Sequence, residues 1–344
     1  MAVYTELSKT LLDELTEDYG FGRTLRVCGI REGSVNTNYV LETAKGRFLL
    51  RIDEVKNENE LRRELDLLSF LRKHSFPCPQ SIPDRSGRLY REWEGKCVAI
   101  FRYHEGHALA VERLKDAHLE AIGRTLGNLH VLGKVYKKGV ENRFSFDRMV
   151  ALYASVRERL PSYFRKVRRT LDDETDYLTR FLERKLPKGI IHGDLFADNL
   201  LFRGDRLSTV LDFEAACRGK FIYDIATAVN ALCFVDDHYS LERFRQLMNG
   251  YEAVRTLSLA EWDAFPNELR YSSLRFTVTR LQDFLLRQID GNRRVEKDFG
   301  EFLGRLQILR REKDGGMEDL LMAMATGYDY RRYQKVRAGE RVST

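Results

Sequence analysis

The chain has 344 residues, of which 43% are hydrophobic and 32% charged, a composition typical of a folded protein with room for two lobes. Its net charge of +6 suits an anionic small substrate, and no basic-aromatic array accompanies it to indicate nucleic acid. No apolar run approaches the roughly 18 residues of a membrane span, and no signal peptide is read. The five cysteines lack a C-x-x-C pair, which argues against a disulfide framework or a zinc site. We therefore expect a cytoplasmic protein that does not bind a membrane.

The first hundred residues alternate between β-rich runs and helical segments. A short amphipathic helix is predicted over residues 5–19, ending at Gly20. Strands are predicted at 25–30, 37–42, 48–52, 88–91 and 97–103. Leucines at helical spacing predict a second helix over 57–73. This part of the chain is therefore expected to form a small sheet with one main helix.

Helical periodicity dominates the chain beyond residue 116. The predicted helical regions are 116–133, 146–185, 222–254 and 258–289. A strand-loop-strand segment at 189–213 interrupts them, and a hinge is predicted near 104–110. A small β-rich lobe followed by a larger, mainly helical lobe predicts an α+β, protein-kinase-like fold. The expected domains are a nucleotide-binding lobe at 1–105, a catalytic and substrate lobe at 106–312, and an extension at 313–344.

One polar segment carries the strongest chemical signal. Asp194 and Asn199 follow the apolar run Ile190-Ile191, and Asp212 follows Val210-Leu211. Phosphoryl transfer needs a carboxylate that orients the attacking hydroxyl and accepts its proton, and oxygen ligands that hold magnesium. The intervals of five and eighteen residues from Asp194 match that arrangement, with Asp194 as the base and Asn199 and Asp212 as metal ligands. Each residue alone would more often cap a turn, so the prediction rests on the set.

Residues around this segment are given supporting roles. His192 is expected to pack beneath the catalytic loop, and Asp224 is expected to tie the loop to the following helix. Glu214 stands where protein kinases carry glycine. The literal triplet Asp298-Phe299-Gly300 has no strand before it, so Asp298 is interpreted as a helix cap rather than a metal ligand.

The rest of an ATP site is predicted from weaker signals. The turn at 31–38 contains Gly33, Ser34 and Asn36, whose backbone could approach phosphates, although most such turns are plain hairpins. Arg51 ends a strand at the position where protein kinases place a phosphate-binding lysine. An arginine there carries the same positive charge and can also contact phosphate.

Two further features complete this predicted site. The glutamate that pairs with the strand-end cation is expected to be Glu64, with Glu60 as the second choice. The hinge that offers backbone groups to adenine is expected at Phe101, Arg102, Tyr103 and His104.

Taken together, these residues resemble the aminoglycoside phosphotransferase/choline kinase-like superfamily, and within it most closely the bacterial homoserine kinases of this fold. The resemblance runs in order from about residue 1 to 310. Its pieces are Gly33-Ser34-Val35-Asn36-Thr37-Asn38-Tyr39, Ile191-His192-Gly193-Asp194-Leu195-Phe196-Ala197-Asp198-Asn199, Tyr223-Asp224-Ile225-Ala226, Asn230-Ala231-Leu232-Cys233-Phe234, Gly250-Tyr251, Arg255-Thr256-Leu257, Leu274-Arg275-Phe276 and Thr279-Arg280-Leu281. The resemblance implies an enzyme that uses ATP and Mg²⁺ to phosphorylate L-homoserine, on the way to threonine.

An acceptor of that kind carries a carboxylate, an ammonium and a hydroxyl. Arg275 or Arg280 could bind the carboxylate, because Arg matches its geometry, although a salt bridge within the protein is an equal interpretation of each. Asp198 or Glu214 could take the ammonium. Two alternatives stay open: a kinase for an aminoglycoside, a choline-like alcohol or a sugar, and a non-catalytic ATP-binding module. The sequence does not predict an oligomeric state.

Overall fold

A computed structural model describes residues 5–30, 36–139, 141–290 and 297–310, with side chains in the last helical turn before residue 291 left out. The contacts divide the chain into two compact units. The first comprises Met1–Gly106, Ser208–Glu214 and Asp290–Glu296, and the second comprises His107–Leu207, Ala215–Ile289 and Lys297–Thr344. The short segment from Ser208 to Glu214, which carries Asp212, thus groups with the N-terminal part of the chain.

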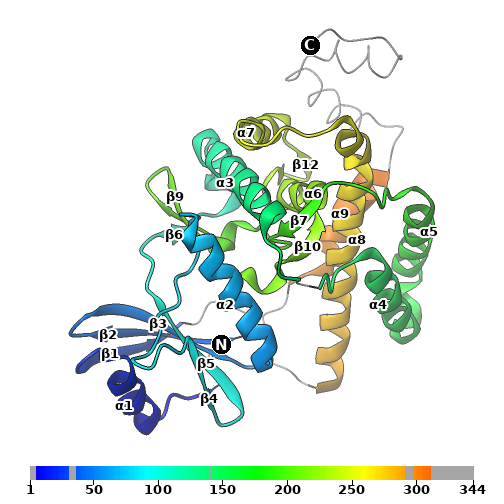
Figure 1. Cartoon of the computed structure of the whole chain (residues 1–344). Coiled ribbons are helices and arrows are strands. Elements are labelled where there is room, and N and C mark those ends of the chain that lie inside the picture. The colour runs from blue at the N-terminus through cyan, green and yellow to red at the C-terminus, as the bar shows by residue number, and fades with distance from the viewer. Residues whose placement is uncertain (1–4, 31–35, 140, 291–296, 311–344) are drawn as a thin grey trace. The chain divides into compact units, whose positions relative to one another are not determined.

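The first unit is built on an antiparallel sheet of five strands, drawn in blue to cyan in Figure 1, in the order β1-β2-β3-β5-β4. Its elements are α1 (Lys9–Asp18), β1 (Thr24–Gly29), β2 (Thr37–Thr43), β3 (Gly46–Asp53), α2 (Glu58–Lys73), β4 (Tyr90–Trp93) and β5 (Lys96–Arg102). In the register of the central strands, Arg51 on β3 lies opposite Asn38 on β2 and Ala99 on β5. All the strands and both helices predicted for this region are present, with ends shifted by a few residues.

The two helices of this unit each bury one apolar face, and the start of α2 is fixed by a capping residue. Asn57 caps α2 in a reciprocal pair with Glu60, whose side chain accepts from the Asn57 backbone N–H. The leucines of α2 are buried, as amphipathic spacing requires. The helix α1 contributes Leu11 and Leu15 to a core shared with strand residues such as Leu50. This packing fixes β3, and therefore the end of the strand that carries Arg51.

The second unit is mainly helical, with short strands around the catalytic segment. Its helices are α3 (Asp116–Val135), α4 (Phe146–Arg159), α5 (Arg165–Phe181), α6 (Phe221–Leu232), α7 (Leu241–Glu252), α8 (Leu259–Asp290) and α9 (Phe299–Arg310), with the 3₁₀ turns η1 (Val111–Arg113), η2 (Ser162–Phe164), η3 (Ala197–Asn199) and η4 (Phe213–Ala215), the last at the boundary of the units. The strands are β6 (His107–Ala108), β7 (Lys188–Ile191), β8 (Leu200–Arg203), β10 (Cys217–Lys220), β11 (Phe234–Val235) and β12 (His238–Tyr239). The strand β9 (Arg206–Val210) starts in this unit and passes into the first unit at Ser208. In Figure 1, α4 and α5 lie on one side of the long helix α8, and α3, α6 and α7 lie on the other.

Close backbone packing of α3 against α7 depends on two glycines. A Cβ at Gly123 would lie 1.8 Å from the carbonyl oxygen of Leu247, and one at Gly250 would lie 2.0 Å from that of Glu120. Any side chain at either position would push the helices apart. The contact holds α3, which carries His130, in the interior of the unit.

The structure corrects three sequence predictions in this unit. The helical region predicted at 146–185 is two helices, because Pro161 cannot continue α4 and starts the η2 turn instead. The region predicted at 222–254 is also two helices, separated by the β11–β12 hairpin, whose turn places Asp236 and Asp237 at positive φ. The loop expected between the two strands of 189–213 contains one further strand, β8, which pairs with β9.

Two expectations about the chemistry of the chain can be compared with the structure. None of the five cysteines takes part in a disulfide. Among the described helices, none has the length and apolar character that crossing a membrane would require.

Candidate active site

Arg51, predicted to be a nucleotide-binding cation, forms a buried ion pair at the end of β3. Its Nη1 and Nη2 donate to the two carboxylate oxygens of Glu64 at 2.8 and 3.1 Å, and its Nε donates to Asp53 at 3.1 Å. Its guanidinium also lies over the ring of Phe101, 4.9 Å from the centroid. Glu60, the second choice as partner, caps α2 instead. Arg51 is thus held by two carboxylates and an aromatic face.

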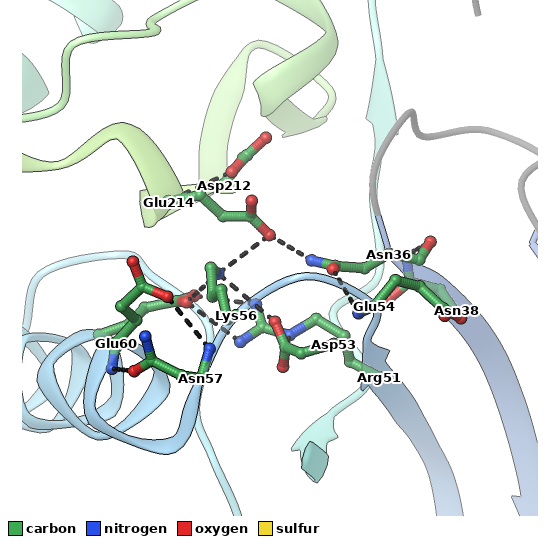
Figure 2. A network of polar contacts seen from close by, with 11 residues as sticks. Asn36, Asn38, Arg51, Asp53, Glu54, Lys56, Asn57, Glu60, Asp212 and Glu214 are labelled. Atoms are coloured by element: carbon green, nitrogen blue, oxygen red, sulfur yellow. Dashed lines mark hydrogen bonds and ion pairs between the residues drawn. The ribbon is translucent and has the colours of Figure 1, made fainter. Parts of the chain in front are cut away.

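Lys56 is a second cation in this network, and sequence reasoning missed it. Its Nζ lies 2.5 Å from Glu64, 3.0 Å from Glu214 and 3.5 Å from Asp53, and only 12% of its side chain is exposed. Figure 2 shows Lys56 between α2 and the segment that carries Glu214. The available signal was its place five residues after Arg51 and directly before the helix cap Asn57.

The charges of this network set the pKa values of its carboxyl groups. Burial alone would raise the pKa of Glu64, but Arg51 and Lys56 outweigh it and lower the pKa to about 2. For Asp53 burial dominates over the same two cations, so its pKa is raised. Burial lowers the pKa of Lys56, but Glu64 and Glu214 more than compensate, so its pKa is raised and its ammonium stays charged.

Asp212, the predicted metal ligand, lies just after β9 in an uncommon backbone conformation. Its φ of +57° is in the left-handed region, which few residues other than glycine adopt. Its Oδ1 accepts from the Glu214 backbone N–H at 3.3 Å. The Glu214 carboxylate also accepts a short hydrogen bond from Asn36 Nδ2, as Figure 2 shows. Glu214, predicted as a possible ammonium ligand, is therefore already bound by an amide and by Lys56.

Other residues predicted for the nucleotide site are only partly described. Gly33 and Ser34 lie outside the described residues. At the predicted hinge, the backbone N–H of Arg102 donates to Gln80 and that of Tyr103 to Arg47. Burial, with Arg72 and Arg102 nearby, lowers the pKa of His104.

Asp194, the predicted base, lies in the second unit on a sharply turned loop after β7. Gly193 has a φ of +76°, and a Cβ there would lie 3.1 Å from the carbonyl oxygen of Ala215, so the turn needs glycine. The Asp194 backbone N–H donates to Nδ1 of the buried His192 at 3.3 Å, as the packing role predicted for His192 requires. Asn199 Nδ2 donates to the Asp194 carbonyl at 2.9 Å, which closes the loop.

Asp224 ties this loop to α6 as the sequence predicted. Its carboxylate accepts the backbone N–H groups of His192 at 2.8 Å and Gly193 at 2.7 Å. It also lies 3.1 Å from Nε2 of His130, a residue on α3 that sequence reasoning missed because a lone histidine in a helical pattern gives no signal. Burial alone would raise the pKa of Asp224, but these donors lower it.

The hydrogen bonds continue from His130 to the start of α8. Nδ1 of His130 lies 2.7 Å from the Tyr251 hydroxyl, which accepts from Arg255 at 2.9 Å. Arg255 in turn donates to Glu261 at 2.7 Å. Burial lowers the pKa of His130 despite Asp224, so the ring is neutral. Because its Nε2 donates to Asp224, its Nδ1 accepts from Tyr251, and the chain of donors runs in one direction.

The residues predicted for the acceptor have different surroundings. Arg275 is buried between the rings of Phe144 and Phe276, and its Nη1 lies 3.4 Å from Oδ1 of Asp194. Arg280 instead pairs with Glu301 at 2.6 Å. Asp198 is 65% exposed and lies 3.6 Å from Lys297. Of the two arginines, Arg275 is the one beside the predicted base.

The predicted metal ligands offer the donor atoms that a magnesium ion prefers. Because Asn199 Nδ2 donates to the backbone, its carbonyl oxygen is the atom that can bind a cation, and Asp212 supplies a carboxylate. Within the described ranges, no group of three or more His, Cys, Asp or Glu side chains could hold a metal ion. Asn199 belongs to the second unit and Asp212 to the first, and each carries an oxygen donor of the kind that magnesium binds.

Comparison with known proteins identifies the class. The model of the "Phosphotransferase enzyme family" matches residues 26–257, more than half of the chain. Among solved structures, an amicoumacin kinase in complex with AMP-PNP and Ca²⁺ has a TM-score of 0.70 at 16% identity, covering 89% of this chain and 93% of that one. The spectinomycin phosphotransferase APH(9)-Ia has a TM-score of 0.66 at 12% identity, covering 90% and 99%. The chain belongs to the phosphotransferase enzyme family and has its kinase-like fold.

Curated relatives are more similar in sequence. A homoserine kinase of Parvibaculum lavamentivorans is 36% identical over 312 residues, which cover 90% of this chain and 96% of that protein. A homoserine kinase of Agrobacterium fabrum is 35% identical with the same coverage. A third, from Methylobacillus flagellatus, is 34% identical over 289 residues, 84% of this chain and 89% of that protein. The similarity extends over nearly the whole length of these relatives.

Proposed function

We propose that this protein is an ATP- and Mg²⁺-dependent kinase that phosphorylates the side-chain hydroxyl of L-homoserine to give O-phospho-L-homoserine. The observation that carries the proposal is the identity of about 35% to proteins named homoserine kinase over almost their full length. Antibiotic kinases of known structure share the fold at 12–16% identity. Identity this low supports a common fold but says nothing about a common substrate.

In the proposed reaction the acceptor hydroxyl attacks the γ-phosphorus of ATP, and the bond to ADP breaks. Asp194 orients the hydroxyl and takes its proton. Asn199 and Asp212 are the residues that would hold magnesium, which supplies positive charge to the phosphate oxygens. The hydrogen bonds of His192 and Asp224 to the loop backbone keep Asp194 in place. On the nucleotide side, Arg51 and Lys56 supply buried positive charge next to β3.

For the acceptor, we assign the carboxylate to Arg275. Its guanidinium is buried and 3.4 Å from Asp194, so a small amino acid could contact both residues at once. An Arg fits a carboxylate with two parallel hydrogen bonds. Arg280 is engaged with Glu301 and the Asp298 carbonyl, so it is assigned to packing of α8 against α9. Asp198 is assigned to the ammonium, as an exposed acid on the catalytic loop.

The first test measures turnover with a panel of acceptors and the Asp194→Asn variant. L-Homoserine should be consumed in preference to aminoglycosides, choline and sugars. Asp194→Asn should lower kcat by about 10²–10⁴-fold, as loss of a general base does, while ATP binding persists. Near-normal turnover of this variant would show that the assigned base is wrong. ATP binding without turnover of any acceptor would favour a non-catalytic module.

A second test isolates the carboxylate contact. Arg275→Lys should raise KM for homoserine but not for 3-aminopropan-1-ol, the same molecule without its carboxylate. Arg280→Lys is the matched change on the same helix and should treat both acceptors alike. An equal loss toward both acceptors in Arg275→Lys would contradict the assignment.

A further inference from the structure

The segment that carries Asp212 is attached to the first unit at three places. The Val210 backbone N–H donates to the Pro77 carbonyl at 2.7 Å. The buried ring of Phe213 lies edge-on to Phe76, with centroids 6.2 Å apart. The third attachment is the Glu214 carboxylate, which is bound by Lys56 and Asn36. A backbone hydrogen bond at Val210 lies before Asp212, and an aromatic contact at Phe213 lies directly after it. The attachment at Glu214 is ionic.

Such an attachment matters because Asp212 is in a conformation that its own residue type disfavours. A left-handed backbone at a residue other than glycine is disfavoured and persists only where the surroundings hold it. The Glu214 backbone N–H contacts the Asp212 carboxylate directly, so the position of Glu214 also sets the direction of that carboxylate. Loss of the Glu214 side-chain contacts would therefore weaken what holds the Asp212 backbone and carboxylate in this position.

The Glu214 carboxylate is also matched in charge where it lies. Its side chain is 16% exposed, and its Oε1 lies 3.0 Å from the Lys56 ammonium. The Asn36 amide that donates to it is itself held, because Asn36 Oδ1 accepts from the Glu54 backbone at 3.4 Å. Lys56 is fixed on its other side by Glu64 on α2. Glu214 therefore links the metal-ligand segment to β2 and α2 through two residues, as Figure 2 shows.

We propose that Glu214 is a positioning residue for the nucleotide and metal side of the site, acting through Lys56 and Asn36, and that it does not bind the ammonium of the acceptor. The inference rests on the proposed phosphotransferase chemistry but not on the identity of the acceptor. Lys56 is paired with three carboxylates. If the Glu214 carboxylate were lost, the Lys56 ammonium would still be paired with Glu64 and Asp53. The acceptor ammonium is left to Asp198.

The test is direct binding of ATP by isothermal titration calorimetry, without an acceptor, in Mg²⁺ and again in EDTA. In Glu214→Gln the ratio of the two affinities should fall by about tenfold or more, as expected when a charge-assisted contact is lost. Lys56→Met should lower the same ratio, and the double variant should be no worse than the more affected single variant. Lys56→Arg keeps the charge and should retain most of the ratio.

Steady-state kinetics supply the second readout. Glu214→Gln should raise KM for Mg-ATP and leave KM for homoserine within about twofold, whereas Asp198→Asn should do the reverse. Should Glu214→Gln not fold, Glu214→Asp keeps the charge on a shorter side chain and should show a smaller change in the same direction.

Three results would overturn the proposal. They are a raised homoserine KM with unchanged Mg-ATP binding in Glu214→Gln, no change in either quantity, and an unchanged Mg²⁺ ratio in Lys56→Met. Failure of the proposed function is distinguishable, because the wild-type protein would then bind Mg-ATP without phosphorylating homoserine.

Discussion

The two polar networks of this protein are built in different ways. The network of the first unit is ionic: Arg51 and Lys56 are shared among Asp53, Glu64 and Glu214. The network of the second unit is a directed chain of hydrogen bonds from Arg255 through Tyr251 and His130 to Asp224. A cation shared among several carboxylates keeps a partner when one of them is lost, whereas a directed chain of hydrogen bonds has one arrangement of donors and acceptors.

The networks also end on different kinds of group. The Asp224 carboxylate binds two backbone N–H groups of the catalytic loop, so its chain fixes main-chain geometry. The ionic network ends on the side chains of Glu214 and Asn36. We therefore expect changes in the second network to appear mainly as lost stability and turnover, and changes in the first to appear mainly as altered nucleotide and metal binding.

Two tryptophans allow this comparison to be tested separately in each unit. Trp93 lies on β4 of the first unit and Trp262 on α8 of the second. A Trp93→Phe background reports unfolding of the second unit by fluorescence, and a Trp262→Phe background reports the first. Separate reporters are needed because a protein with two compact units need not unfold in one step.

The largest effect is expected for Asp224→Ala. It leaves two backbone N–H groups and His130 without their acceptor in a fully buried position. Because each unsatisfied buried donor costs about 1–3 kcal/mol, we expect a loss of about 3–5 kcal/mol of unfolding free energy, measured by urea unfolding followed at Trp262. Asp205→Ala changes an exposed acid of the same unit and should leave the unfolding free energy nearly unchanged. A cost below 1 kcal/mol for Asp224→Ala would break the comparison.

Glu268 of the second unit and Glu64 of the first should contribute to the pH dependence of stability in opposite directions. Burial, partly offset by Lys220, raises the pKa of Glu268 on α8 from 4.5 to about 7. The folded state then holds the proton more strongly, so the stability of the second unit should fall as pH rises from 4.5 to 7. Glu64 has the opposite shift, to about 2, so its contribution to the first unit is present above pH 4.5 and is lost as pH falls toward 2.

This prediction is measured as unfolding free energy at several pH values with each tryptophan reporter. In Glu268→Gln the decline of stability at Trp262 between pH 4.5 and 7 should disappear, while the pH response at Trp93 is unchanged. Identical slopes in the wild-type protein and Glu268→Gln would refute the assignment.

A smaller effect is expected for Tyr251→Phe. It removes the hydroxyl that donates to His130 and accepts from Arg255 without changing the packed ring. An unsatisfied buried group costs about 1–3 kcal/mol, so stability at Trp262 should fall by that amount and kcat should fall with KM for ATP unchanged. A raised KM for ATP with normal stability would mean that this chain acts on the nucleotide side instead.

The smallest effect is expected for Asp298→Ala. The Asp298 carboxylate accepts from the Gly300 backbone N–H at 2.8 Å directly before α9, as the sequence predicted for a helix cap. Loss of such a cap costs about 1 kcal/mol. Activity at saturating ATP, Mg²⁺ and homoserine should be unchanged, and a loss comparable to that of Asp212→Ala would give this triplet a role in the chemistry.

Local patterns predicted most of the fold. Alternating and helical spacings are set by neighbours in the chain, so the strands of the first unit and helices such as α2 could be placed from residue order. The errors fall at breaks inside periodic regions. At Pro161 the proline itself was a local signal that helical spacing does not register, and at the β11–β12 hairpin the break is not visible in the spacing. Boundaries that depend on tertiary contacts are not encoded in spacing alone.

The sequence by itself determined the chemical class, because Asp194, Asn199 and Asp212 have intervals that are countable along the chain. It also pointed to Asp224 and to the pairing of Arg51 with Glu64. Only the tertiary structure brought in Lys56 and His130, since their partners are supplied by segments distant in the chain or on another element. It likewise separated Arg275 from Arg280 and placed Glu214 against Lys56, because the direction of a side chain depends on what packs around it.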